Sequence, residues 1–282
     1  MLRWTAAVST LMLAVASLAA PQRTTLFVPL DDQPSWRDMA YLAAIPASER
    51  ANKGGGSLVA LDAKSGYGPE FADYIARYQP DAVWLLDDPK TSILPAEKRP
   101  PANLKIQRIQ ADSAEAAAVK LSNQFWSTSK IAVVCRADLY DIAVFAASLA
   151  GLLDAPLLFT TGDALSSATE REIKRLGVTE LVSLGFSAPE FSGIVTPLSS
   201  PFEAMKWVRS RGLKVSYLAA VNPLDRANTT TRKLSLIGAQ LATGRKGLVA
   251  PLRAKVEWKR PFESRVLKST LPKGIPASEA KP

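Results

Sequence analysis

The chain has 282 residues, of which 47% are hydrophobic and 22% charged, and its formal net charge is +9. This is the composition of a globular protein with room for one large or two smaller domains, and its basic charge favours acidic partners. It contains no histidine and one cysteine, Cys135, which excludes histidine-based triads, histidine general bases, histidine- or thiolate-bound zinc and an intramolecular disulfide.

The N-terminus has the three-part pattern of a secretory signal peptide. One positive charge, on Arg3, precedes an uncharged stretch from Thr5 to Leu18, and Ser17-Leu18-Ala19 offers small residues at both specificity positions. An uncleaved anchor helix is the alternative, but the apolar stretch is shorter than the ~20 residues that span a bilayer. We therefore expect cleavage after Ala19, no integral membrane span afterwards, and a location in the periplasm, the cell envelope or the extracellular space.

Short apolar or β-branched runs alternate with helical patterns along the rest of the chain. Such near-continuous apolar runs are typical of strands covered on both faces of a parallel sheet. The expected strands are Thr25–Leu30, Ser57–Leu61, Ala82–Leu86, Lys105–Ile109, Ile131–Cys135, Pro156–Thr160, Glu180–Leu184, Val215–Ala220 and Gly247–Pro251. This alternation predicts an α/β, Rossmann-like fold with largely parallel sheets flanked by helices.

Proline-rich stretches suggest how the chain is divided. Residues 89–103 contain four prolines and read as a linker, and residues 254–282 read as a tail or a linker to something further. The predicted organisation is a signal peptide (1–19), an N-terminal α/β unit (24–88), the linker, a second α/β domain (104–253) and the tail.

Several helix starts are predicted from capping patterns. Ser167 with Glu170 forms a capping box for a helix that ends at Gly177, and Asp112 with Glu115 makes a similar start. The apolar segment 142–153 is too short to cross a membrane and is expected to be a central buried helix.

Aspartates follow several of the predicted strands. In a parallel sheet the strand C-termini share one edge, where such folds bind ligands, so these carboxylates could bind a divalent cation or act as general acid and base. The alternative is helix capping, for which Asp32 and Asp138 are well placed. The residues of the possible catalytic set are Asp31, Asp32, Asp62 and Asp87.

The run from Asp141 to Ala150, continued by 154–160, resembles the cell-wall-binding repeat of the type 2 class. That repeat reads D-A-L-A-A-x-P-L-A, then a-P-I-L-L. Ile142 and Ser148 replace its usual Ala and Pro, and Phe186 replaces the usual second Gly after the following strand. The matching positions are Asp141, Leu149, Ala150, Ala155, Pro156 and Leu158, with Gly185 after the next strand.

The likeness covers about 130–186, and a fainter copy lies near 215–253. There Ala239 to Ala242 and Gly247 to Val249 echo the first copy at an offset of 92 residues (241 − 149), with Lys233 in place of Asp141. Separately, the run 28–34 resembles the opening of an uncharacterised exported family with a PLDDRP start, with Gln33 in place of its Arg.

The repeat resemblance implies an α/β domain that helps hold exported proteins on the envelope, often as tandem copies that bind an anionic wall polymer, and it implies no catalytic residues. The leading hypothesis is therefore an exported, non-catalytic protein whose partner is an anionic cell-envelope polymer rather than nucleic acid, with no metal and no cofactor. The alternatives are an exported hydrolase or divalent-metal-dependent enzyme that uses the strand-end aspartates, and a structural part of a longer envelope protein. The candidate binding residues are Asp138, Asp141, Pro156 and Gly185.

Overall fold

The computed structural model describes residues 23–53, 57–63, 69–88, 106–188, 190–227 and 233–252. The predicted signal peptide, linker and tail lie outside these residues. The described residues fold into parallel sheets flanked by helices, which confirms the predicted α/β class.

The first sheet contains four parallel strands in the order β2-β1-β3-β4. Helix α2 covers one face of this sheet through a small aromatic cluster around Phe27 and Phe71, and α1 and α3 belong to the larger core on the other face. The elements of this first repeat are β1 (Thr24–Leu30), α1 (Trp36–Ala51), β2 (Ser57–Asp62), α2 (Pro69–Tyr78), β3 (Ala82–Asp87), β4 (Ile106–Gln110) and α3 (Ala114–Phe125).

The second sheet repeats this arrangement, with four parallel strands in the order β6-β5-β7-β8. In both sheets the first strand of the repeat (β1 or β5) is a central strand, and the strand that follows the first helix (β2 or β6) is an edge strand. The elements of the second repeat are β5 (Ile131–Arg136), α4 (Tyr140–Leu152), β6 (Leu157–Thr160), α5 (Ser167–Leu176), β7 (Glu180–Leu184), β8 (Ile194–Leu198) and α6 (Pro201–Ser210).

A third, shorter repeat follows. Strands β9 (Leu218–Val221) and β10 (Leu248–Pro251) pair in parallel, and between them lie the 3-10 helix η2 (Pro223–Ala227) and helix α7 (Leu234–Gly244). The sequence predicted two units, whereas the described residues form the same β-α-β unit three times. The fainter copy near 215–253 coincides with this third repeat.

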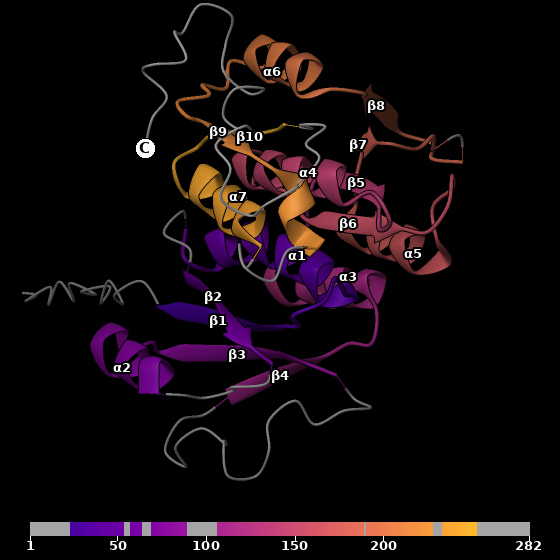
Figure 1. The fold of residues 1–282 in the computed structure, drawn as a ribbon. Coiled ribbons are helices and arrows are strands. Elements are labelled where there is room, and N and C mark those ends of the chain that lie inside the picture. Colours follow the sequence, from indigo (N-terminus) through magenta and orange to yellow (C-terminus); the bar gives the residue numbers. More distant parts are fainter. Residues whose placement is uncertain are drawn as a thin grey trace, which may run out of the picture.

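The first helices of the three repeats form the centre of the molecule. Helices α1, α4 and α7 each pack against the other two, and they lie between the sheets in Figure 1. Alanines allow this close approach, and at Gly151 of α4 an added Cβ would lie only 2.0 Å from Cγ2 of Thr243 in α7. The predicted central helix at 142–153 is therefore confirmed as α4, with its middle fully buried.

Three details of the predicted organisation differ from the structure. Strand β4 pairs with β3, so the first sheet extends into the segment that the sequence division gave to the second domain. Strand β8 was missed because it carries Pro197 and only Leu198 of its five residues is buried, which is the pattern of an edge strand.

The third difference concerns caps. Helices α3 and α5 are capped by Ser113 and Ser166, each one residue away from the expected position. Neither Asp32 nor Asp138 is a cap, because α1 is capped by Ser35 and α4 has no side-chain cap.

Candidate functional site

The carboxyl edge of the first sheet holds the aspartates that the sequence singled out, and arginines contact two of them. Arg37 of α1 donates from Nη1 to Asp31 Oδ1 at 2.5 Å, and its Nη2 lies 3.6 Å from Asp88. Arg108 of β4 forms an ion pair with the buried Asp87. These carboxylates are therefore engaged by guanidinium groups at the sheet edge.

The third repeat adds two more cations to this edge. Lys233 Nζ donates to Asp38 Oδ1 at 2.5 Å and to the backbone oxygens of Asp31 and Gln33 at 2.7 and 3.1 Å. Arg226 Nε donates to Asp38 Oδ2 at 2.9 Å. Asp38 is fully buried and the Lys233 side chain is 5% exposed, so the edge is closed by a buried ion-pair network.

The aspartates of the possible catalytic set lie at the same sheet edge as this ion-pair network. Asp31 and Asp87 contact arginines, and Asp32 and Asp62 lie exposed on the same edge. Within the described ranges, no group of three or more metal-ligating side chains is gathered here or elsewhere. The arrangement is that of a structural ion-pair cluster.

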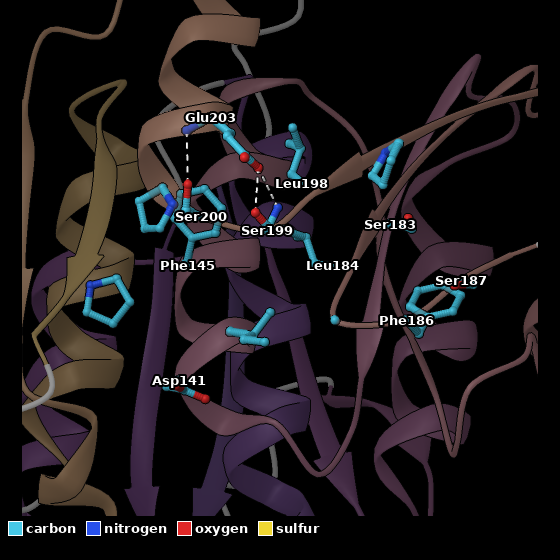
Figure 2. Close-up of a pocket in the computed structure, with 15 residues that line it drawn as sticks. Asp141, Phe145, Ser183, Leu184, Phe186, Ser187, Leu198, Ser199, Ser200 and Glu203 are labelled. Atoms are coloured by element: carbon cyan, nitrogen blue, oxygen red, sulfur yellow. Dashed lines mark hydrogen bonds between the residues drawn. The ribbon is translucent and has the colours of Figure 1, made fainter.

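The carboxyl edge of the second sheet is different, because it opens into a pocket of about 970 Å³. This volume lies in the range of small-molecule sites. The pocket extends between α4, the ends of β7 and β8, and the start of α6, and Pro251 of β10 reaches it from the third repeat (Figure 2). Its lining is Asp141, Ile142, Phe145, Ser183, Leu184, Gly185, Phe186, Ser187, Pro197, Leu198, Ser199, Ser200, Pro201, Glu203 and Pro251.

The N-terminus of α6 forms one end of the pocket. Ser200 caps the helix by accepting from Glu203 N at 3.2 Å. Glu203 Oε2 in turn accepts from Ser199 N at 2.9 Å and from Ser199 Oγ at 2.7 Å. These hydrogen bonds lower the pKa of Glu203 below its ordinary value of 4.5, so the carboxylate stays charged and holds the loop in place (Figure 2).

Ser183 carries the most unusual polar group of the pocket. Its residue is 1% exposed, and within the described part of the chain its Oγ has no hydrogen-bond partner. A buried hydroxyl without a partner costs about 1–3 kcal/mol. Most native side chains avoid this cost. The Ser183 Oγ atom is itself buried, so it is not exposed to the open pocket.

Gly185 shapes the turn beside Ser183. Its φ of +76° is in the left-handed region, and a Cβ there would lie 2.7 Å from Leu139 Cδ1 and 3.1 Å from Ile142 Cδ1. Only glycine meets both conditions without strain.

The structure brings together two of the four candidate binding residues. Asp141 and Gly185 line the pocket. Asp138 lies outside it, where Arg136 donates to both its carboxylate oxygens, at 2.9 and 2.6 Å, and lowers its pKa. Pro156 is buried just before β6, at the amino end of the sheet.

Sequence reasoning missed five polar residues of the pocket, which are Ser183, Ser187, Ser199, Ser200 and Glu203. The pair Ser200 and Glu203 has the spacing of a helix start with proline at the first position, so the helix could have been found. Nothing in the local sequence shows that Ser183 would remain unpaired.

Exposed cations lie on α6, on the segment after it and on the turn between α7 and β10. We call this group the basic surface, and it consists of the exposed residues Lys206, Arg209, Arg211, Lys214, Arg245 and Lys246. The segment that follows α6 contacts the turn before β10, where Ser216 N donates to Lys246 O at 3.3 Å. Arg211 stacks on Trp207 at 4.3 Å and Arg245 on Tyr217 at 5.5 Å from the ring centroids.

Comparisons with known proteins identify one protein with partial sequence similarity and two solved structures with a similar fold. No protein-family model matches the chain. Over 138 residues the chain is 29% identical to the N-acetylmuramoyl-L-alanine amidase LytC of Bacillus subtilis (strain 168), a match that covers 49% of this chain and 25% of LytC.

Two solved structures from Clostridium difficile share the fold. Cwp6 matches with a TM-score of 0.60 and 13% identity over 82% of this chain and 37% of its own. Cwp8 matches with a TM-score of 0.61 and 14% identity over 88% of this chain and 43% of its own. The chain thus spans a quarter of LytC and less than half of either structure. No helix in the described ranges is both long enough and apolar enough to cross a membrane.

Proposed function

We propose that this chain is an exported, non-catalytic protein that attaches to an anionic polymer of the bacterial cell wall. The similarity to LytC, whose name identifies it as an N-acetylmuramoyl-L-alanine amidase, and the fold shared with Cwp6 and Cwp8 support a place at the cell wall. The repeat resemblance around Asp141 supports attachment rather than chemistry.

The observation that carries the proposal is the basic surface. It contains six exposed cations. Neighbouring carboxylates include Glu180, which pairs with Arg211, Glu203, which is held by Ser199, and Glu49, whose Oε1 would lie 3.5 Å from a Cβ at Gly244 beside Arg245. Three of the cations lie over aromatic rings, Lys206 over Phe202, Arg211 over Trp207 and Arg245 over Tyr217. A polymer of sugars and acidic groups would be held there by charge and by stacking on the rings.

The alternative of an exported hydrolase has less support. The LytC match covers only a quarter of that enzyme, and Asp31 and Asp87 of the possible catalytic set are paired with arginines. The third alternative, a structural part of a longer envelope protein, is compatible with attachment and predicts the same binding surface.

Co-sedimentation of residues 20–282 with isolated cell walls over a salt series tests the proposal. Retention at low salt should fall steeply as salt screens the exposed cations. The triple variant Lys206→Glu, Arg209→Glu and Lys214→Glu should bind at least roughly tenfold more weakly, since three attractive charges become repulsive.

The matched control reverses three exposed cations of the first repeat, Lys53, Arg77 and Lys120. Both variants change three charges from positive to negative, so they have the same net charge. Equal losses in the two variants would mean that only net charge matters, and retention of the first variant at the wild-type level would refute the basic surface as the attachment site.

A further inference from the structure

The third repeat carries most of the exposed apolar side chains. Of the nine large apolar side chains that are exposed in the described residues, five belong to this repeat and two lie at its borders. They are Leu218 of β9, Leu224 of η2, Leu234, Ile237 and Leu241 of α7, and the bordering Tyr217 and Leu252. Apolar groups that gather on one part of a surface mark interaction sites.

On α7 these side chains form one stripe, which we call the α7 stripe. Leu234, Ile237 and Leu241 are spaced three and four residues apart, so they lie on the same side of the helix. The whole helix contains no charged residue. Because the solvent side of a surface helix normally carries charged and polar residues, the α7 stripe has the pattern of a helix side that is covered.

The α7 stripe lies beside an open strand edge. At Gly238, on the border of the stripe, a Cβ would lie 2.5 Å from Val221 Cγ1 of β9, so helix and strand are in direct contact. The corresponding strands β1 and β5 pair on both sides, whereas in the described part of the chain β9 pairs with β10 alone. The open edge and the stripe therefore form one surface.

This edge also lacks the usual protection against pairing. Edge strands are commonly guarded by charged side chains or prolines, as β4 is by Arg108 and β8 by Pro197. Strand β9 reads Leu-Ala-Ala-Val and has neither, so it is suited to pair with a strand from outside.

Charge and symmetry favour a second copy of this chain as the source of that strand. The net charge is +9, so two copies repel each other least where they meet through an uncharged surface. The surface is also self-complementary. A two-fold axis perpendicular to the β9–β10 sheet would place β9 antiparallel to its copy and the two α7 helices side by side, which is the isologous contact of most homodimers.

We propose that this chain forms a two-fold dimer in which β9 pairs with β9 of the second copy and the two α7 stripes pack together. The sheet then runs β10-β9-β9-β10 through both copies, and the apolar side chains of both stripes leave water. This dimer goes beyond the proposed wall attachment and does not depend on it.

Sedimentation velocity of residues 20–282 tests the dimer. Over roughly 5–200 µM, a range suited to moderate affinity, the wild type should pass from the monomer mass to twice that mass. Ile237→Asp places a carboxylate from each copy in the centre of the apolar contact and should weaken association at least about tenfold. A wild type that stays monomeric throughout, or a variant that dimerises equally well, would overturn the proposal.

Ile194→Asp is the matched control. Ile194 is an isoleucine that is even more exposed than Ile237, 66% against 43%, but it lies at the start of β8. This variant should dimerise as the wild type does. An equal loss in both variants would show that the α7 stripe is not the interface.

Cross-linking gives a second readout that keeps the side chain uncharged. Ile237→Cys should be joined into a covalent dimer by a short bismaleimide, because the two-fold axis brings residue 237 close to its copy, and Ile194→Cys should not. The native Cys135 is buried and leaves the wild type as a blank. A dimeric Ile237→Cys protein that does not cross-link would place the interface elsewhere and overturn the proposal.

The dimer and the wall attachment can fail separately. The triple variant of the basic surface should remain dimeric, because its substitutions lie on α6 and the segment after it. Loss of the dimer in that variant would contradict an interface on α7 and β9. A monomeric wild type that still sediments with cell walls would overturn the dimer and leave the attachment standing.

Discussion

The two four-stranded sheets have the same strand order, yet their carboxyl edges are built in opposite ways. At the first edge, Asp31, Asp87 and Asp38 contact arginines and a lysine, two of these cations coming from the third repeat. At the second edge the third repeat contributes Pro251, and a pocket of about 970 Å³ remains. One repeated unit thus supplies an edge closed by ion pairs and an edge that opens into a pocket.

The difference between the two edges depends on which side chains the third repeat contributes to each of them. Lys233 and Arg226 lie on the segment before and at the start of α7, and they satisfy a fully buried Asp38. No charged side chain from β10 enters the pocket of the second repeat among the residues that line it. The same strand-end geometry therefore becomes a salt-bridge cluster or an open site, according to the side chains that reach it.

The largest expected effect tests the structural role of the first edge. Asp38→Ala leaves two cations without their buried carboxylate and should lower the free energy of unfolding by about 3–5 kcal/mol. Asp138→Ala, which removes an aspartate that is 59% exposed from its pair with Arg136, should cost less than about 1 kcal/mol. Urea unfolding measures both, and a similar small loss in the two variants would contradict the assignment of the first edge as structural.

Two fully buried serines sharpen the contrast. Ser148 donates to Phe145 O at 2.8 Å and accepts from Val249 N at 3.0 Å, so Ser148→Ala should cost about 1–3 kcal/mol by leaving the Val249 amide unpaired. Ser183→Ala removes a hydroxyl that has no partner and should change stability by less than about 1 kcal/mol. Thermal or urea unfolding in the absence of ligand gives the comparison, and an equally large loss at Ser183 would mean that its hydroxyl is satisfied in the free protein.

Two glycines with similar positive φ angles allow the cost of backbone strain to be measured separately from the cost of a steric clash at Cβ. Gly185 (φ +76°) and Gly212 (φ +74°) should each lose about 1–2 kcal/mol on substitution by alanine, because the left-handed region disfavours a Cβ. Gly185→Ala should lose roughly 1 kcal/mol more, since its Cβ meets Leu139 and Ile142 whereas that of Gly212 meets open space. Equal losses, measured by urea unfolding, would show that the pocket turn is not packed as described.

The smallest expected effect is a pH dependence of the pocket loop. The pKa of Glu203 is lowered by hydrogen bonds from Ser199, so these bonds are present above its ordinary value of 4.5 and are lost as the pH falls through the lowered folded-state pKa. The Ser199 amide signal should follow this titration by NMR, and Glu203→Gln should flatten it. A Ser199 signal that moves in the same way in the Gln variant would assign the titration to another group.

Much of the fold could be predicted from the sequence because its strands are short, apolar and bounded by breakers. Every predicted strand has a counterpart, and β8 was missed because an exposed edge strand with Pro197 lacks the apolar pattern. The threefold repetition was only partly visible in the sequence. At the start of α7, Lys233 stands at the position that corresponds to Asp141 of the second repeat, so the motif that marks that repeat is absent there. The structure gives that lysine a different task, the neutralisation of Asp38.

The site was harder to predict than the fold. Asp31, Asp32, Asp62 and Asp87 lie at one sheet edge, as expected from a parallel sheet. The arginines that pair with Asp31 and Asp87 come from α1 and β4, and the sequence alone does not show such contacts. Two predicted binding residues, Asp141 and Gly185, line the pocket. The unpaired state of the Ser183 hydroxyl depends on the packing around the second sheet edge, so the local sequence does not indicate it.

Hydrogen–deuterium exchange of residues 20–282, free and bound to solubilised cell-wall polymer, tests the central contrast most directly. Binding should protect amides of segments 206–217 and 245–246 of the basic surface and leave segments 30–38 and 87–88 unchanged. Protection confined to the first sheet edge would contradict the account, because it would place polymer binding at the ion-paired aspartates and not at the basic surface.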